Sequence, residues 1–121
     1  MTDPIDAATF ANLVEMTGGD LEFVDELVDT YLADGASQLA AMGAALDAGE
    51  VEVLTRAAHS LKSGSLNVGA LDLGGLCRAL EEEGRGGAVP TDGSARVATI
   101  GDAFHAARAA LLDERGRRTA S

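Results

Sequence analysis

His59 is the residue of this sequence best suited to chemistry, because of the charges on either side of it. Imidazole is largely neutral near pH 7 and is a good nucleophile in that state. The first two cations of the chain, Arg56 and Lys62, lie three residues before and three residues after His59. Positions three apart are neighbours on a helix. An acidic chain therefore places its first positive charges beside one imidazole, which indicates that His59 handles an anion.

A helix is predicted over residues 50–69, and its buried side determines where His59 points. Apolar and small residues recur there at spacings of three and four. At 100° per residue, His59 lies about 140° from the centre of this stripe and should face solvent. The stripe consists of Val51, Leu54, Ala58, Leu61, Ser65 and Val68.

The exposed face of the same helix carries Lys62, Ser63 and Leu66 within about 60° of His59. These neighbours would suit a phosphorylated imidazole. A phosphoryl group brings nearly two negative charges, which Lys62 can stabilise as a mobile point cation. Ser63 is small and leaves room for an approaching protein, and Leu66 offers an apolar side chain that a docking partner can bury. A histidine on a helix surface most often has no function, so these residues alone do not name a reaction.

Two helices are expected before this one. The first covers residues 6–16, with Asp6 as its N-cap residue. The second begins after Asp20, which is also a suitable N-cap, and ends near Gly49. Glycine weakens a helix interior, so the second segment is either one long helix or two helices joined near Gly35.

Two more helices are expected after residue 69. A fourth helix spans about residues 70–83, and a glycine-rich loop covers residues 84–90. A last helix begins after Asp92 or Ser94, either of which can cap it. The inward positions of the fourth helix are predicted to be Leu73, Leu76, Cys77 and Leu80.

The composition favours an all-α protein with an aliphatic core. Aromatic residues make up only 3% of the chain, while Ala and Leu recur at helical spacing. We expect one domain over residues 1–121, with its core at about 6–114 and a disordered tail at 115–121. We also expect a monomer, because no long apolar stripe is left exposed.

The net charge of −11 excludes several classes of function. Residues 1–50 hold eleven acidic residues and no Lys or Arg, whereas residues 51–121 hold nine of each sign. This argues against binding to nucleic acid or to an anionic membrane surface. The simplest reading of the acidic half is a solvated face.

Other features of the sequence predict a cytoplasmic protein that has neither a metal site nor a nucleotide site. The single cysteine, Cys77, cannot form an internal disulfide, which fits a reducing compartment. We see no secretory signal and no apolar run of membrane length. His59, Cys77 and His105 lack metal-ligand spacing, and the sequence has no phosphate-binding glycine loop.

Residues 54–81 resemble the histidine-containing phosphotransfer (HPt) domain of bacterial two-component phosphorelays. The resemblance extends more loosely over roughly residues 10–115. Two positions depart from the family pattern, since Ser63 stands where Gly is most common and Leu66 where Gly or Ala is usual. The larger Leu66 puts partner choice in doubt. The matching residues are Ala58, His59, Leu61, Lys62, Asn67-Val68-Gly69-Ala70 and Leu76-Cys77-Arg78-Ala79-Leu80-Glu81.

The resemblance implies a fold and a mechanism. The fold is an antiparallel four-helix bundle with an additional short N-terminal helix. A receiver domain, or a hybrid sensor histidine kinase, donates a phosphoryl group from an aspartate to Nε2 of the exposed histidine, and a second receiver accepts it. The chain is then a phosphoryl carrier and not an ATP-dependent kinase. It needs no cofactor, because the receiver supplies the Mg²⁺.

Supporting roles follow from the same resemblance. Glu81 aligns with a position that often lies close to the imidazole, where it would accept a hydrogen bond from Nδ1. The alternative is an ordinary solvated glutamate. Gly69 would end the helix. Arg56 and Arg85 are expected to help hold the phosphoryl group or the receiver, unless nearby acids neutralise them.

Two other functions remain open from the sequence. A helical adaptor could bind receiver domains without being phosphorylated, and crowding by Leu66 would favour it. A phospho-accepting domain of a chemotaxis-type kinase would need attached ATP-binding and dimerisation domains. The identities of donor, acceptor and signal are not encoded in any motif that we recognise.

Overall fold

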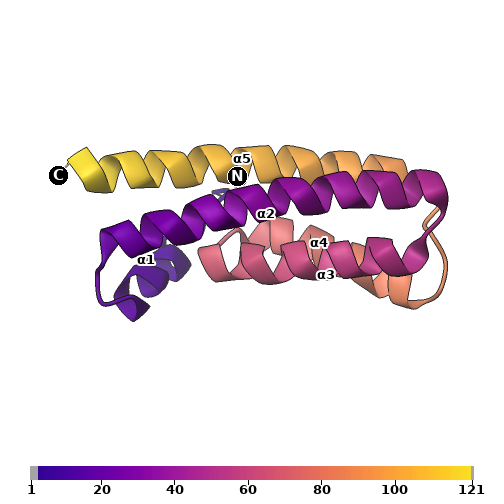
Figure 1. Cartoon of the computed structure of the whole chain (residues 1–121), viewed down its shortest axis with the longest axis horizontal. Coiled ribbons are helices and arrows are strands. Elements are labelled where there is room, and N and C mark those ends of the chain that lie inside the picture. The colour runs from indigo at the N-terminus through magenta and orange to yellow at the C-terminus, as the bar shows by residue number, and fades with distance from the viewer. Residues whose placement is uncertain (1–2, 121) are drawn as a thin grey trace.

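The computed structural model describes residues 3–120, and this part of the chain contains five α-helices and no strand (Figure 1). Its all-helical character agrees with the composition. The helices are α1 (Ala7–Met16), α2 (Leu21–Ala48), α3 (Val51–Val68), α4 (Leu71–Arg85) and α5 (Gly93–Ala120).

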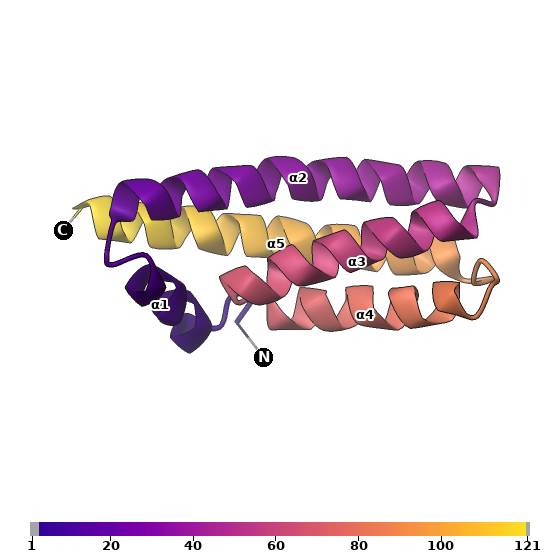
Figure 2. The same cartoon turned by 60° about the horizontal axis from the view of Figure 1, so that its bottom comes forward.

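Helices α2 to α5 run side by side, each opposite in direction to the one before it (Figures 1 and 2). Helix α3 packs between α2 and α4, and α5 packs against both α2 and α4. The short α1 lies against α3 and the beginning of α2. Two residues join α2 to α3, and two join α3 to α4, which is short enough to favour antiparallel neighbours; the connection from α4 to α5 is longer, at seven residues.

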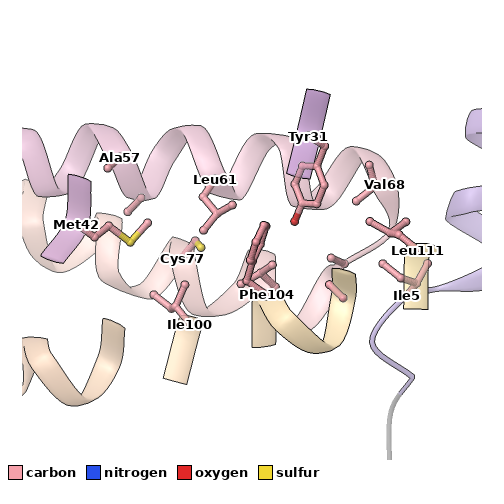
Figure 3. Packing of buried hydrophobic residues seen from close by; sticks show 14 of the residues in the cluster. Ile5, Tyr31, Met42, Ala57, Leu61, Val68, Cys77, Ile100, Phe104 and Leu111 are labelled. Atoms are coloured by element: carbon pink, nitrogen blue, oxygen red, sulfur yellow. The ribbon is translucent and has the colours of Figure 1, made fainter. Parts of the chain in front are cut away.

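The interior is aliphatic, with few aromatic side chains (Figure 3). The rings of Tyr31 and Phe104 meet at a centroid distance of 5.9 Å. The hydroxyl of Tyr31 forms a buried hydrogen bond of 2.8 Å with Ser65, which satisfies both polar groups inside the bundle. The largest fully buried aliphatic side chains are Met42, Leu54, Leu61, Leu73, Leu80, Ile100 and Leu111.

Helix α2 continues through Gly35 as a single helix, which decides between the two alternatives left by the sequence. Gly35 is buried, and the ring of Phe104 on α5 lies directly over it. A Cβ atom at this position would stand 2.7 Å from Cζ of Phe104. The glycine therefore serves the close approach of α5 and does not break α2.

The predicted helix ends are confirmed at three positions. Asp6 accepts a hydrogen bond of 3.0 Å from the backbone of Thr9 and caps α1. Asp20 caps α2 in the same way, through the backbone of Phe23 at 3.1 Å. Gly69 ends α3 with φ of 92°, a left-handed conformation that glycine adopts without steric cost.

Three sequence expectations were wrong. Leu76 is exposed, since it lies about 90° from the centre of the inward face of α4. The loop begins at Gly86, because α4 continues to Arg85. Residues 115–120 were expected to form a tail but continue α5, where Arg115 pairs with Asp25 and Asp29 on α2. The last expected tail residue, Ser121, lies outside the described residues.

Candidate functional site

Helix α3 presents His59 to solvent because its opposite face is buried. The side chain of His59 is 52% exposed, as the helical spacing predicts. Its neighbour Ala58 is fully buried, so one turn of the helix has both a core side and a solvent side. The buried residues of α3 are Leu54, Ala57, Ala58, Leu61, Ser65 and Val68.

A buried carboxylate from α4 lies beside the imidazole. Glu81 is only 1% exposed, and its Oε2 atom lies 2.7 Å from Nδ1 of His59. Its Oε1 atom accepts a hydrogen bond of 2.6 Å from Nζ of Lys62. The alternative of an ordinary solvated glutamate is therefore wrong. Glu81 stays buried because it follows Cys77 by one helical turn and so continues the inward face of α4.

A second cation completes the surroundings of Glu81. Arg85, one turn further along α4, places its Nη2 atom 2.6 Å from Oε2 of Glu81. The carboxylate thus has two cations and one imidazole around it. Its single negative charge is more than balanced by Lys62 and Arg85, and the cluster keeps one net positive charge.

The cluster keeps Glu81 ionised despite its burial. Burial acts to raise the pKa of the Glu81 carboxyl, because a charge is costly away from water. Hydrogen bonds from Lys62 and His59, and the charges of Lys62 and Arg85, outweigh that effect. The pKa of Glu81 therefore lies below its usual value of 4.5.

An ionised Glu81 determines which imidazole nitrogen can react. A carboxylate only accepts hydrogen bonds, so the contact of 2.7 Å requires Nδ1 of His59 to carry the proton. In the neutral ring, Nε2 then holds a lone pair. With half of the side chain exposed, this arrangement suits His59 to nucleophilic attack by Nε2 on an electrophile brought by another molecule.

An open depression of ≈ 690 Å³ adjoins His59 between the beginning of α3 and the end of α4. Arg56 and Arg85 both line it, as does the carboxylate-bearing Glu52. Arg56 forms no ion pair with any side chain that the structure describes. The depression therefore brings cations next to the imidazole, partly offset by one exposed acid.

The predicted residues Lys62 and Leu66 are on the same helix as His59, but their side chains are less exposed than expected. Lys62 is 19% exposed and engaged by Glu81, so it is not a mobile cation. Leu66 is half-buried, and its side chain lies against Gly74 on α4. Ser63 is exposed, as expected.

Sequence reasoning missed the two glycines of α4 that face α3, Gly74 and Gly84. Both glycines are buried within α4, where a glycine lowers helix stability relative to alanine. Gly74 precedes Glu81 by seven residues and Gly84 follows it by three, so all three lie on one face of α4. The spacing of these two glycines around Glu81 was the feature of the sequence that could have identified them.

Alternative sites are less suited to chemistry. The described residues contain no group of three or more His, Cys, Asp or Glu side chains able to hold a metal ion. A depression of ≈ 710 Å³ between α1, α2 and α3 is mainly apolar, with Asp34 as its one charged lining residue. Among the described helices, none has the length and apolar character needed to cross a membrane.

An exposed histidine with a buried carboxylate partner, on an all-helical fold, defines a recognisable class. A family model described as Hpt domain matches residues 26–113, and the chain belongs to this family. Hpt domains are phosphoryl carriers without a cofactor, distinct from kinases, and they act with receiver domains and histidine kinases in phosphorelays. The recognised resemblance is thereby confirmed.

One solved structure is similar over nearly the whole length. It is the crystal structure of histidine-containing phosphotransfer protein B (HptB) from Pseudomonas aeruginosa PAO1. The TM-score is 0.87 at 32% sequence identity, and the match covers 97% of this chain and 98% of that one. No curated protein sequence matches this chain significantly.

Proposed function

We propose that this protein accepts a phosphoryl group on Nε2 of His59 from the phospho-aspartate of a receiver domain or hybrid histidine kinase and passes it to another receiver. The observation that carries this proposal is the contact of 2.7 Å between Nδ1 of His59 and Glu81, which leaves Nε2 as the open nitrogen. Family membership supplies the phosphorelay context.

The phosphoryl transfer requires no group to accept a proton. The lone pair of Nε2 forms a P–N bond while the P–O bond to the donor aspartate breaks, which regenerates the donor carboxylate. The Nδ1 proton stays in place, so the ring becomes cationic as it bonds to phosphorus. Glu81 stabilises this developing charge across the hydrogen bond, and the reverse steps deliver the phosphoryl group to the next aspartate.

The supporting residues have distinct roles in this proposal. Lys62 and Arg85 carry two positive charges against the one negative charge of Glu81, and the excess positive charge stabilises the incoming phosphoryl group. Ser63 keeps the approach to His59 open. Gly69 is structural, because it ends α3 and lets the next residues turn into α4.

The partner docks on the face that carries His59. Leu66 contributes apolar contact area there, and Arg56 and Arg85 meet the acidic pocket that holds Mg²⁺ in a receiver. We propose that the protein does this as a monomeric single domain, an antiparallel four-helix bundle of α2 to α5 with α1 added at its N-terminal end.

Phosphotransfer from a phosphorylated receiver domain in the presence of Mg²⁺ tests the proposal. Wild-type protein should acquire label that is labile to acid and stable to base, as expected for a P–N bond. The variant His59→Gln should acquire none. The matched control is His105→Gln on α5, an exposed histidine far along the chain that should leave labelling unchanged.

Absence of label on the wild-type protein, from several receivers and from the small donor phosphoramidate, would refute the proposal. Binding of receivers without label would support the non-phosphorylated adaptor instead. The feature that favoured the adaptor was crowding by Leu66, and the contact of Leu66 with Gly74 weakens that argument. If Leu66→Ala is labelled at the wild-type rate, crowding by Leu66 does not hinder phosphorylation.

A further inference from the structure

The contact between His59 and Glu81 depends on how closely α4 approaches α3. The two atoms belong to different helices and are 22 residues apart in the sequence. Protein N–H···O hydrogen bonds have heavy-atom distances of about 2.7–3.2 Å, and the contact of 2.7 Å lies at the short end of that range. A shift of α4 by less than one ångström is therefore enough to loosen it. Whatever sets the spacing of these helices also sets the state of the imidazole.

Two glycines of α4 form close contacts with α3 on either side of Glu81. Gly74 faces Leu66, and a Cβ atom at position 74 would lie 2.5 Å from Cδ2 of Leu66 and 2.9 Å from its Cγ. Gly84 faces Thr55, and a Cβ atom at position 84 would overlap Oγ1 and stand 3.1 Å from Cβ of Thr55. Neither position can hold a residue larger than glycine unless Leu66, Thr55 or α4 itself moves.

These contacts share one antiparallel alignment with the reactive pair. Leu66 follows His59 by seven residues, as Gly74 precedes Glu81 by seven. Thr55 precedes His59 by four, and Gly84 follows Glu81 by three. The reactive pair thus lies between two glycine contacts along the same α3–α4 boundary, and the absence of a side chain at both glycines allows α4 to approach α3 closely.

The partners of the two glycines differ in how easily they can move. The hydroxyl of Thr55 donates a hydrogen bond of 2.7 Å to the carbonyl of Val51, which fixes its rotamer. A methyl group at position 84 would therefore push α4 away. Leu66 is flexible and half-buried, so a methyl group at position 74 would displace its side chain and produce a smaller shift of α4.

We infer that Gly74 and Gly84 are positioning residues for the phosphotransfer reaction: they hold α4 close enough to α3 for Glu81 to fix the Nδ1–H form of His59. This inference deepens the proposed function and rests on it for its biological meaning. Its physical content, the state of the imidazole in the unphosphorylated protein, can be measured separately.

The test is the ratio of the two neutral imidazole tautomers of His59, read from ¹⁵N shifts of the ring nitrogens above the pH at which the ring is protonated. In the wild type, the Nδ1–H form should dominate. Gly84→Ala should lower its excess about fivefold, which corresponds to losing about half of the free energy of a hydrogen bond to a charged group. Gly74→Ala should lower it by less, because Leu66 can move.

The matched control is Gly75→Ala, also in α4 and next to Gly74. A Cβ atom there meets nothing within 4 Å, so the ratio should not change. Rescue variants separate spacing from general damage. Thr55→Ala combined with Gly84→Ala, and Leu66→Ala combined with Gly74→Ala, remove the overlapping atoms and should restore the ratio towards the wild-type value.

Unchanged ratios in folded Gly84→Ala and Gly74→Ala proteins would overturn the inference, as would an equal loss in Gly75→Ala. If Gly84→Ala does not fold, Gly74→Ala and its rescue decide the question. Phosphotransfer by the same variants should follow the tautomer ratio. A wild-type protein that shows the Nδ1–H excess but accepts no phosphoryl group would refute the proposed function and leave this inference standing.

Discussion

Replacing Glu81 with glutamine removes the charge of the carboxylate while keeping its size. In the structure one oxygen of Glu81 accepts from His59 and Arg85, and the other accepts from Lys62. Glutamine has a single acceptor oxygen. If that oxygen keeps the contact with His59, the amide nitrogen must face the ammonium group of Lys62, donor against donor. The substitution therefore keeps the imidazole bond but makes it neutral, and it releases Lys62.

The size of the effect follows from the difference between charged and neutral hydrogen bonds. A bond to a charged group contributes about 1.5–3 kcal/mol, against about 0.5–1.5 kcal/mol for a neutral pair. A loss of about 1 kcal/mol in the transition state, where the ring becomes cationic, corresponds to a rate about fivefold slower. Glu81→Ala loses the whole interaction, about 2 kcal/mol, and should be about 30-fold slower.

The assay is single-turnover transfer from an excess of phosphorylated receiver, with phosphoramidate as a second donor that needs no docking. Both donors should be slowed by similar factors, because Glu81 acts on the ring and not on the partner. Glu82→Gln is the control, since Glu82 is the exposed next residue of α4. Equal rates for wild type and Glu81→Gln, in protein shown to be folded, would refute the reasoning. So would an equal slowing by Glu82→Gln.

Other consequences of the structure can be tested on stability and reactivity. In the folded protein the pKa of Glu81 lies below its usual 4.5, so its contribution to stability is complete above pH 4.5 and is lost as the pH falls through the folded value. Denaturant titrations from pH 7 to pH 3 should therefore show that the free energy of unfolding declines less steeply for Glu81→Gln than for the wild type. Gly35→Ala should destabilise the fold by about 1–3 kcal/mol through overlap with Phe104, whereas Gly43→Ala in the same helix, where a Cβ atom meets nothing within 4 Å, should be neutral or stabilising by up to about 1 kcal/mol. Thermal melting would distinguish them, and a Gly35→Ala protein as stable as wild type would contradict the packing argument. Burial, with a smaller contribution from Glu81, raises the pKa of Cys77 to about 12, so a thiol reagent at pH 8 should modify it only after unfolding; rapid labelling of native protein would contradict this.

Features that depend on one helix alone could be predicted from the sequence. The exposure of His59 follows from the spacing of apolar residues in α3, and the caps Asp6 and Asp20 follow from residue type and position. These patterns are local, because a helix repeats every 3.6 residues whatever it packs against. The same reasoning failed for Leu76, which lies at the edge of the buried face.

Features that depend on two helices could not be predicted. The resemblance suggested Glu81 as a partner of His59, but its burial and its bonds to Lys62 and Arg85 required the alignment of α3 against α4. Leu66 was expected to stand out from the surface, yet the space left by Gly74 lets it lie against α4. Near the end of α5, Arg115 pairs with Asp29, which lies 86 residues earlier in the chain.

The half-exposed side chain of His59 has a consequence for signalling. On the proposed mechanism, no lid or pocket of the described residues closes over the phosphorylated ring, so the intermediate is open to every receiver that can dock. The carrier then imposes no direction on the flow. Net phosphotransfer between donor and acceptor would follow their relative concentrations and phosphorylation levels. Reversing those levels would return the phosphoryl group to the donor through Nε2 of His59.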